Sequence, residues 1–189
     1  MSKSRENVFT RKMHGKFGDQ LVFRNRDGKS YVANIPKEST APPGEGQQKI
    51  RNRFRLAATW AKIALANPVT REKYEARVTK SMSAYTLAMT DYLRPPVIFE
   101  MIVTRYKGHP GNTILVDATD DFNVKEVSVS ITNPAGELIE EGPCLPPSEE
   151  MAYWQYTATV ENTDLSGTVI SAIATDDPGH TGQSSVTMD

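Results

Sequence analysis

The double proline Pro95-Pro96, which directly follows Arg94, constrains this chain more than any other feature. The residue before a proline is pushed out of helical conformations, and each proline lacks a backbone N–H donor. No helix can therefore run through this point. Apolar residues recur with a helical period before it and alternate after it. We expect a stiff hinge between a part that ends in helices and a part made of strands.

The charge reverses at the same junction. Residues 1–94 hold 19 Lys and Arg against 8 Asp and Glu, a net charge of +11. Residues 95–189 hold 3 against 15, a net charge of −12, so the overall charge of −1 hides two opposed halves. A basic and an acidic part in one chain favour association of copies head to tail, or an anionic partner for the basic part.

Residues 1–45 are predicted to form a basic arm with a β-hairpin and a linker. The first 20 residues show no clear period, whereas strand-like runs at 21–26 and 29–34 flank Asp27-Gly28. This dipeptide is typical of a two-residue hairpin turn, because both turn positions need a positive φ. An isolated hairpin is marginal in water, so we expect it to dock on the helices or on another chain. The Pro- and Gly-rich residues 36–46 indicate a linker.

Residues 46–94 are predicted to be helical, with helices over 47–67, 70–78 and 83–93. The first helix carries a broad apolar stripe made of Ile50, Phe54, Ala57, Ala58, Ala61, Ala64 and Leu65. A second, separate stripe is made of Leu56, Trp60 and Ile63. A helix that is apolar on two sides is usually covered on two sides, by the hairpin, by the next helices or by a neighbouring subunit.

Residues 95–189 are predicted to form an all-β sandwich. The expected strands cover 97–104, 113–119, 126–133, 137–141, 152–161, 168–175 and 184–188. Seven short strands with turns at this spacing are typical of two packed sheets. Trp154 lies on an alternating strand, and we expect it in the core between the sheets. The predicted fold class is α+β: a basic arm with a hairpin, then helices, then an immunoglobulin-like sandwich.

Several motifs in the C-terminal half carry a resemblance to bacterial immunoglobulin-like domains. They are Val-Asp-Ala-Thr-Asp-Asp-Phe-Asn at 116–123, Val-Ser-Val-Ser-Ile at 127–131, Gly-Glu-Leu-Ile-Glu-Glu-Gly at 136–142 and Ala-Ile-Ala-Thr-Asp-Asp-Pro-Gly-His at 172–180. The last motif places His180 where such domains usually have Asn. The resemblance implies the sandwich fold and no catalytic residue.

The N-terminal half resembles proteins of unknown role from Bacteroidota and their phages or mobile elements. The residues that carry this likeness are Gly-Lys-Phe-Gly at 15–18, Val-Phe-Arg-Asn-Arg-Asp-Gly-Lys at 22–29, and then Gln48, Arg53 and Phe54. From it we expect a component of a phage virion, associated with or auxiliary to the capsid. The chain would then be made in the cytoplasm and carried in the virion.

Nothing in the sequence indicates catalysis. No phosphate-binding loop, nucleophile elbow or dinucleotide fingerprint is present, and the three histidines stand in separate turn-like contexts. The single Cys144 excludes an internal disulfide. We expect no enzyme activity and no cofactor. One weak metal candidate is the repeated Ala-Thr-Asp-Asp, whose Asp120, Asp121, Asp176 and Asp177 could hold calcium if both strand ends meet at one pole. The alternative is that these aspartates cap their own turns.

The candidate partner-binding residues are Phe23, Arg24, Arg26, Lys29, Tyr31, Arg51, Arg55, Trp60 and Lys62. Protein subunits, copies of this chain or a capsid protein, are the partners we expect first. Nucleic acid is the second possibility, because the cations could neutralise phosphates while Phe23 and Tyr31 stack on bases. A solvated basic face without a partner is the third. A glycan-binding module would need an export route; the start of the chain shows no secretory signal, and no apolar run is long enough to cross a membrane.

Overall fold

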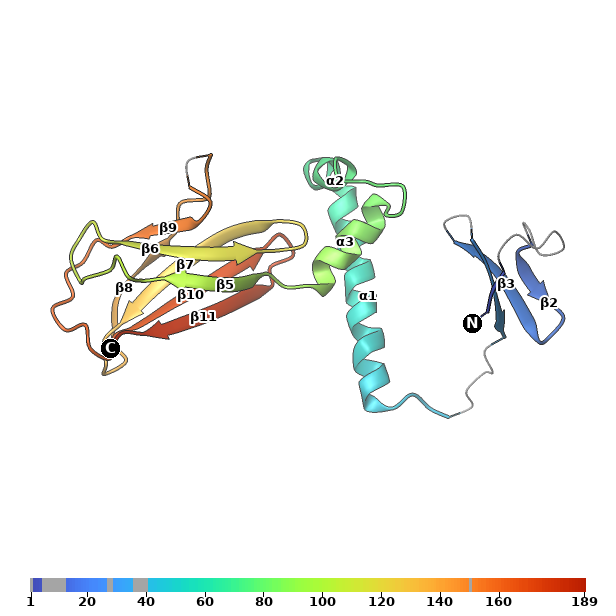
Figure 1. Cartoon of the computed structure of the whole chain (residues 1–189), viewed down its shortest axis with the longest axis horizontal. Coiled ribbons are helices and arrows are strands. Elements are labelled where there is room, and N and C mark those ends of the chain that lie inside the picture. The colour runs from blue at the N-terminus through green and yellow to red at the C-terminus, as the bar shows by residue number, and fades with distance from the viewer. Residues whose placement is uncertain (1, 5–12, 27–28, 36–40, 150) are drawn as a thin grey trace. The chain divides into compact units, whose positions relative to one another are not determined.

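The computed structural model describes residues 2–4, 13–26, 29–35, 41–149 and 151–189 (Figure 1). They belong to two compact units, Met1–Glu45 and Gly46–Asp189. The fold mixes helices with antiparallel sheets, and its C-terminal part is rich in β-structure. This agrees with the expected α+β class. No helix in these described ranges is both long and apolar enough to cross a membrane.

The N-terminal unit contains a four-stranded antiparallel sheet. Its strands are β1 (Ser2–Ser4), β2 (Gly15–Phe17), β3 (Leu21–Arg26) and β4 (Lys29–Asn34), in the order β1-β4-β3-β2. The predicted hairpin is present as β3 and β4, although its Asp27-Gly28 turn lies outside the described residues. The short strands β1 and β2 were not expected, because three residues are too few to show an alternating pattern. None of the residues whose side chains are described in this unit is buried.

Three helices open the second unit, namely α1 (Glu45–Ala66), α2 (Pro68–Glu75) and α3 (Ala84–Leu93). Asn67 caps α2 by accepting a hydrogen bond from the N–H of Val69, and Pro68 occupies its first turn. Ser83 caps α3 through the N–H of Thr86. The chain turns extended at Arg94, where the double proline ends the helix as predicted.

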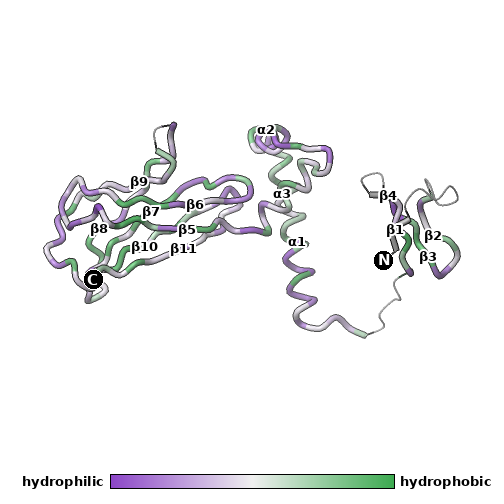
Figure 2. Tube along the Cα trace, in the orientation of Figure 1, coloured by the Kyte–Doolittle hydropathy of each residue, from purple (hydrophilic) through white to green (hydrophobic). Residues whose placement is uncertain are grey.

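The rest of this unit, residues 97–189, is called the two-sheet body below. One antiparallel sheet has the strand order β5-β6-β9 and the other the order β11-β10-β7-β8. The strands are β5 (Val97–Ile102), β6 (Thr113–Thr119), β7 (Val124–Thr132), β8 (Leu138–Pro143), β9 (Trp154–Thr157), β10 (Val169–Asp176) and β11 (Thr181–Thr187). Residues from both sheets share one core, including Val116, Val129, Ile170 and Trp154. Figure 2 shows hydrophobic residues concentrated on these strands.

All seven strands expected in this half are present, with β9 much shorter than predicted. The pattern suggested a strand over 152–161, whereas β9 ends at Thr157. The next residue, Ala158, instead exchanges backbone hydrogen bonds with Gly111 and Asn112 in the β5–β6 loop. The sequence pattern continues past Thr157, but Thr157 pairs with Thr113, the first residue of the neighbouring strand β6, so the pairing stops there. The predicted place of Trp154 in the core is confirmed, since its exposed fraction is 8%.

Candidate interaction surfaces

The sheet of the N-terminal unit separates the predicted partner-binding residues onto two faces. Arg24 and Tyr31 are cross-strand partners and therefore share one face. Phe23 points to the opposite face, because neighbouring residues on a strand alternate. Phe23 thus does not join Arg24 and Tyr31 in a single patch. Arg26 pairs with Lys29 in the backbone register, and the side chains of these two lie outside the described part.

An aromatic pair marks the face of this sheet that carries Phe23. The ring of Phe17, on β2, meets the ring of Phe23 edge to face, with centroids 6.3 Å apart. Phe17 is nevertheless 68% exposed. A hollow of about 270 Å³ lies beside the pair and is lined by Met13, His14, Gly15, Lys16, Phe17 and Phe23. Within its own unit this face offers exposed aromatic surface, which soluble proteins usually cover.

The basic face predicted on α1 is present. Arg51, Arg55 and Lys62 are all exposed. Arg55 donates hydrogen bonds to the side-chain oxygen of Asn52, at 2.8 and 3.2 Å. Trp60 does not belong to this face, because its ring packs on Tyr92 with centroids 6.4 Å apart. The cations of α1 therefore form a surface of their own, without an aromatic residue from the predicted set.

The broad apolar stripe of α1 continues beyond the residues that cover it. Ala57, Ala61 and Ala64 are buried, and the last two belong to the helical core. One and two turns earlier on the same stripe, Phe54 is 51% and Ile50 59% exposed. Figure 1 shows that this end of α1 extends past α2 and α3. Two large apolar side chains at helical spacing are therefore left uncovered within this unit.

The four aspartates of the calcium candidate have other partners. Asp120 accepts hydrogen bonds from the N–H groups of Phe122 (3.2 Å) and Asn123 (3.1 Å), which caps the turn after β6. Asp176 is buried and accepts from the N–H of His180 at 2.6 Å, while the ring Nδ1 of His180 lies 3.3 Å away. These contacts support the turn-capping alternative for both residues.

The other two aspartates pair with cations of the helical segment. Asp121 forms an ion pair with Arg94 at the end of α3. Asp177 lies 3.4 Å from the Lys73 ammonium on α2. Across the described ranges, no three side chains of His, Cys, Asp or Glu are placed to hold a metal ion. Asp121 and Asp177 instead form ion pairs between the two-sheet body and the helical segment.

A buried Tyr–Asp pair lies at the same junction. The Tyr74 hydroxyl on α2 donates to Oδ2 of Asp91 on α3 at 2.5 Å, and Asp91 is only 1% exposed. Oδ1 of Asp91 is buried without a hydrogen-bond partner. Burial raises the pKa of Asp91 to about 7, with smaller contributions from the nearby carboxylates of Asp120 and Asp176. No sequence signal identifies such a pair, because its members come together only when α2 packs on α3.

Phe122 completes this junction from the side of the two-sheet body. Its ring stacks on Tyr74 with centroids 4.3 Å apart, and it belongs to the helical core. The Arg77 guanidinium lies 4.4 Å from the centre of the Phe122 ring and donates to the Phe122 carbonyl oxygen. Phe122 follows directly on the Asp120-Asp121 pair of the repeated motif. The turn that Asp120 caps therefore places this ring against the helical core.

The contacts of Cys144, His109 and His180 are made with other residues and not with one another among the described contacts. Cys144 is buried, and burial raises the pKa of its thiol to about 12, so the nucleophilic thiolate is disfavoured. His109 lies 3.7 Å from Glu161 on an exposed loop, and His180 is held by Asp176. Neither is placed beside the cysteine sulfur by any described contact. The best-defined features are the exposed faces and the contacts between the helices and the two-sheet body.

Comparisons with known proteins show only distant likenesses. No protein-family model matches the chain, and no curated protein matches it. One similar solved structure is CopC from Methylosinus trichosporium OB3b, at 12% identity and a TM-score of 0.35, covering 48% of this chain and 87% of that one. Another is an engineered protein at 14% identity and a TM-score of 0.34, covering 54% of this chain and 25% of that one. Likenesses this weak assign the chain to no family.

Proposed function

We propose that this chain is a non-enzymatic structural subunit of a multi-subunit particle, most specifically a capsid-associated or auxiliary component of a phage virion. The N-terminal unit and the free end of α1 anchor it to other protein subunits, copies of itself or a capsid protein. The two-sheet body, an immunoglobulin-like sandwich in this proposal, projects from the particle. The phage assignment follows from the resemblance of the N-terminal half.

The observation that carries the proposal is the N-terminal sheet, which has strand pairing but no buried residue among those whose side chains are described. Most of the free energy that stabilises a sheet comes from burying apolar side chains on at least one face. Here Phe17 stays 68% exposed beside Phe23. A partner that covers this face would supply the missing burial.

The uncovered end of α1 supports the same conclusion independently. Ile50 and Phe54 continue a stripe whose other members are already packed. Full burial of such a side chain contributes roughly 1.5–3 kcal/mol, and because about half of each is still exposed, covering the rest of both contributes about 1.5–3 kcal/mol in total. That is a useful part of the free energy of a subunit contact.

Sedimentation of a native lysate through a sucrose gradient, with mass spectrometry to locate the chain, tests the proposal. We expect the chain in megadalton particles, in fractions that nuclease treatment does not change. A chain that stays at the top of the gradient as a small species would refute the particle. Phe54→Glu should prevent incorporation, whereas Val69→Glu, at a more exposed apolar position on α2, should not.

The alternative is a nucleic-acid-binding accessory protein of a mobile element. The observation that favours it is the exposed basic face of Arg51, Arg55 and Lys62 on one helix. Neutralised phosphates release counterions, so binding should weaken steeply with salt, by about 0.9 in the log–log slope for each duplex contact. Replacing all three cations with Gln should reduce that slope by about 3. An affinity that does not depend on salt concentration would exclude this face as the site. So would a log–log slope that is the same in the triple variant and the parent chain.

A further inference from the structure

One flank of the two-sheet body has strand edges without a partner strand. β6 pairs with β5 as far as Thr119, whereas its pairing with β9 on the other side stops at Val116. The edge at residues 117–119 therefore has no neighbouring strand among the described residues. On the facing sheet, the pairing of β7 with β8 begins only at Ser128, and a single further hydrogen bond reaches back to Val127. Residues 124–126 form a second edge of the same kind.

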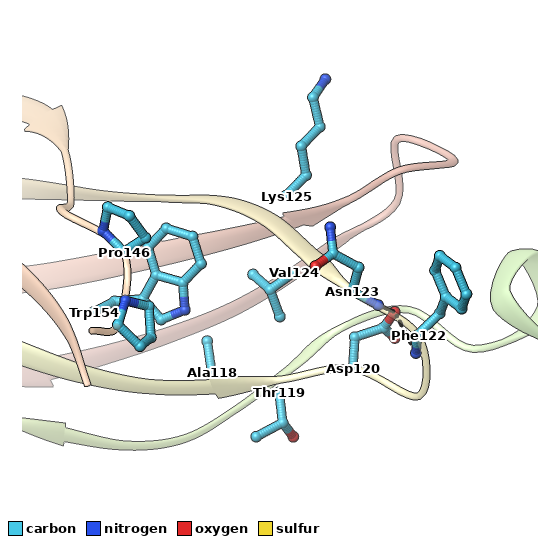
Figure 3. Close-up of a pocket in the computed structure, with 10 residues that line it drawn as sticks. Ala118, Thr119, Asp120, Phe122, Asn123, Val124, Lys125, Pro146 and Trp154 are labelled. Atoms are coloured by element: carbon cyan, nitrogen blue, oxygen red, sulfur yellow. Dashed lines mark hydrogen bonds between the residues drawn. The ribbon is translucent and has the colours of Figure 1, made fainter. Parts of the chain in front are cut away.

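A cleft opens between these two edges. Its volume is about 500 Å³, and it is lined by Ala118, Thr119, Asp120, Phe122, Asn123, Val124, Lys125, Pro146, Pro147 and Trp154. Figure 3 shows Ala118 and Val124 projecting from the two facing strands, with Pro146 and Trp154 at one end. The lining thus combines apolar side chains with strand edges whose main chain has no strand to pair with. This volume lies within the range of clefts that bind ligands.

The opposite flank of the body shows that this opening is local. There Gly182 on β11 approaches the backbone so closely that an added Cβ would lie 2.0 Å from the Pro96 carbonyl oxygen. At this point β11 therefore lies directly against the main chain that leads into β5. Only extended main chain can both pair with a strand edge and place alternate side chains in a cleft, which is how peptides add to sheets. The occupant that fits the open flank is an extended polypeptide segment.

The charge around the cleft indicates which kind of segment. Residues 117–126, which form both edges, contain Asp117, Asp120, Asp121 and Glu126 against Lys125. From the helical segment, Arg94 pairs with Asp121 and Arg77 lies over the Phe122 ring. Figure 3 shows Lys125 extending away from the other lining residues. The whole of residues 95–189 carries a net charge of −12. A basic strand would be attracted to this field, whereas an acidic one would be repelled.

We propose that this flank is a strand-addition site, which binds an extended, basic segment of a partner protein along the edges at residues 117–119 and 124–126. The apolar side chains of the segment enter the cleft beside Trp154. The site is independent of the anchoring surfaces on the N-terminal unit and α1, so it would stand even if the chain belongs to no particle.

Titration of the ¹⁵N-labelled full chain with the peptide Lys-Val-Lys-Val-Lys-Val-Lys tests the site by NMR. We expect saturable shifts at the amides of residues 117–119 and 124–126 and at the Trp154 indole. The acidic counterpart, with Glu at each Lys, should not bind. A peptide N-methylated at alternate amides keeps its charge but cannot pair on that edge, and its affinity should fall at least tenfold.

Matched variants separate pairing at the cleft from general attraction between charges. Thr119→Arg adds bulk and positive charge at an exposed lining position and should weaken binding about tenfold, which corresponds to about 1.4 kcal/mol. Thr187→Arg makes the same change at an exposed strand position outside the cleft and should leave the affinity unchanged. Equal binding of the N-methylated peptide, or equal effects of the two variants, would overturn the proposal. Shifts confined to residues outside the two edges would overturn it as well.

Discussion

The buried carboxyl group of Asp91 should make the stability of the second unit fall as the pH rises towards neutrality. Its pKa is about 7 in the folded chain, against 3.8 for an ordinary aspartate, chiefly because burial penalises the charged form. Between these two values the folded state binds more protons than the unfolded state. The free energy of unfolding therefore decreases as the pH rises through this range.

The size of the effect follows from the same two values. Each pKa unit corresponds to about 1.36 kcal/mol, so the loss between pH 4 and pH 8 approaches about 4 kcal/mol. Asp91→Asn keeps an oxygen that can accept from the Tyr74 hydroxyl but removes the ionisation. The variant should lack this loss and become the more stable protein above pH 7, although its stability at pH 5 matches or falls below that of the parent chain.

Urea unfolding between pH 5 and pH 8.5, followed by tryptophan fluorescence, measures this directly. Both tryptophans, Trp60 and Trp154, belong to the second unit, so the signal does not report on the N-terminal sheet. The difference between the two proteins removes the contribution of other titrating groups, including Asp176, whose pKa burial also raises. Glu100→Gln, at an exposed carboxylate, is the control and should give no such difference. A difference between parent and Asp91→Asn that stays constant across this range would refute the reasoning.

Three further predictions follow from single contacts. Tyr74→Phe removes a hydrogen bond that favours the ionised form of Asp91, so the pKa of Asp91 should rise above about 7, as a carboxyl-labelled NMR titration would show. Gly182→Ala places a Cβ 2.0 Å from the Pro96 carbonyl oxygen, and thermal unfolding should show a loss of about 2 kcal/mol or more. The Cys144 thiol, buried and with its pKa raised to about 12, should react with Ellman's reagent at pH 8 only as fast as the unit opens.

For each of these three predictions, one result would contradict the reasoning. An unchanged or lower pKa of Asp91 in Tyr74→Phe would show that the hydroxyl does not donate to it. Gly46→Ala adds a Cβ with nothing within 4 Å and serves as the control for Gly182→Ala. Equal stability of the two alanine variants would mean that β11 does not approach Pro96 closely. Labelling of the thiol as fast as in urea would place the sulfur at the surface.

Patterns within a few residues accounted for most of the elements. The Arg94-Pro95-Pro96 break, the caps at Asn67 and Ser83 and the alternation around Val127–Ile131 depend on local sterics and hydrogen bonding, which a sequence records. The short strands β1 and β2 were missed because backbone pairing with β4 and β3 defines them, not their own residues. The overlong prediction for β9 failed for the same reason, since a neighbour decides where a strand ends.

The candidate sites were predicted less well than the elements that carry them. Helical spacing alone grouped Arg51, Arg55 and Lys62 on one exposed face. The candidate residues also included Phe23, Arg24 and Tyr31, which strand alternation and the pairing of β3 with β4 divide between the two faces of the sheet. No pattern marked Tyr74, Asp91 or Phe122, which come from two helices and a turn.

The sequence by itself determined the helices, most of the strands, the end of α3 before the double proline and the opposed charges of the two halves. Each of these is a property of neighbouring residues or of their sum. The tertiary structure alone decided which aspartates pair with cations, which carboxyl group is buried with a raised pKa, and where strand edges remain open. Those features depend on distances between segments far apart in the chain, and only the packing of helices and sheets brings such segments within a few ångströms.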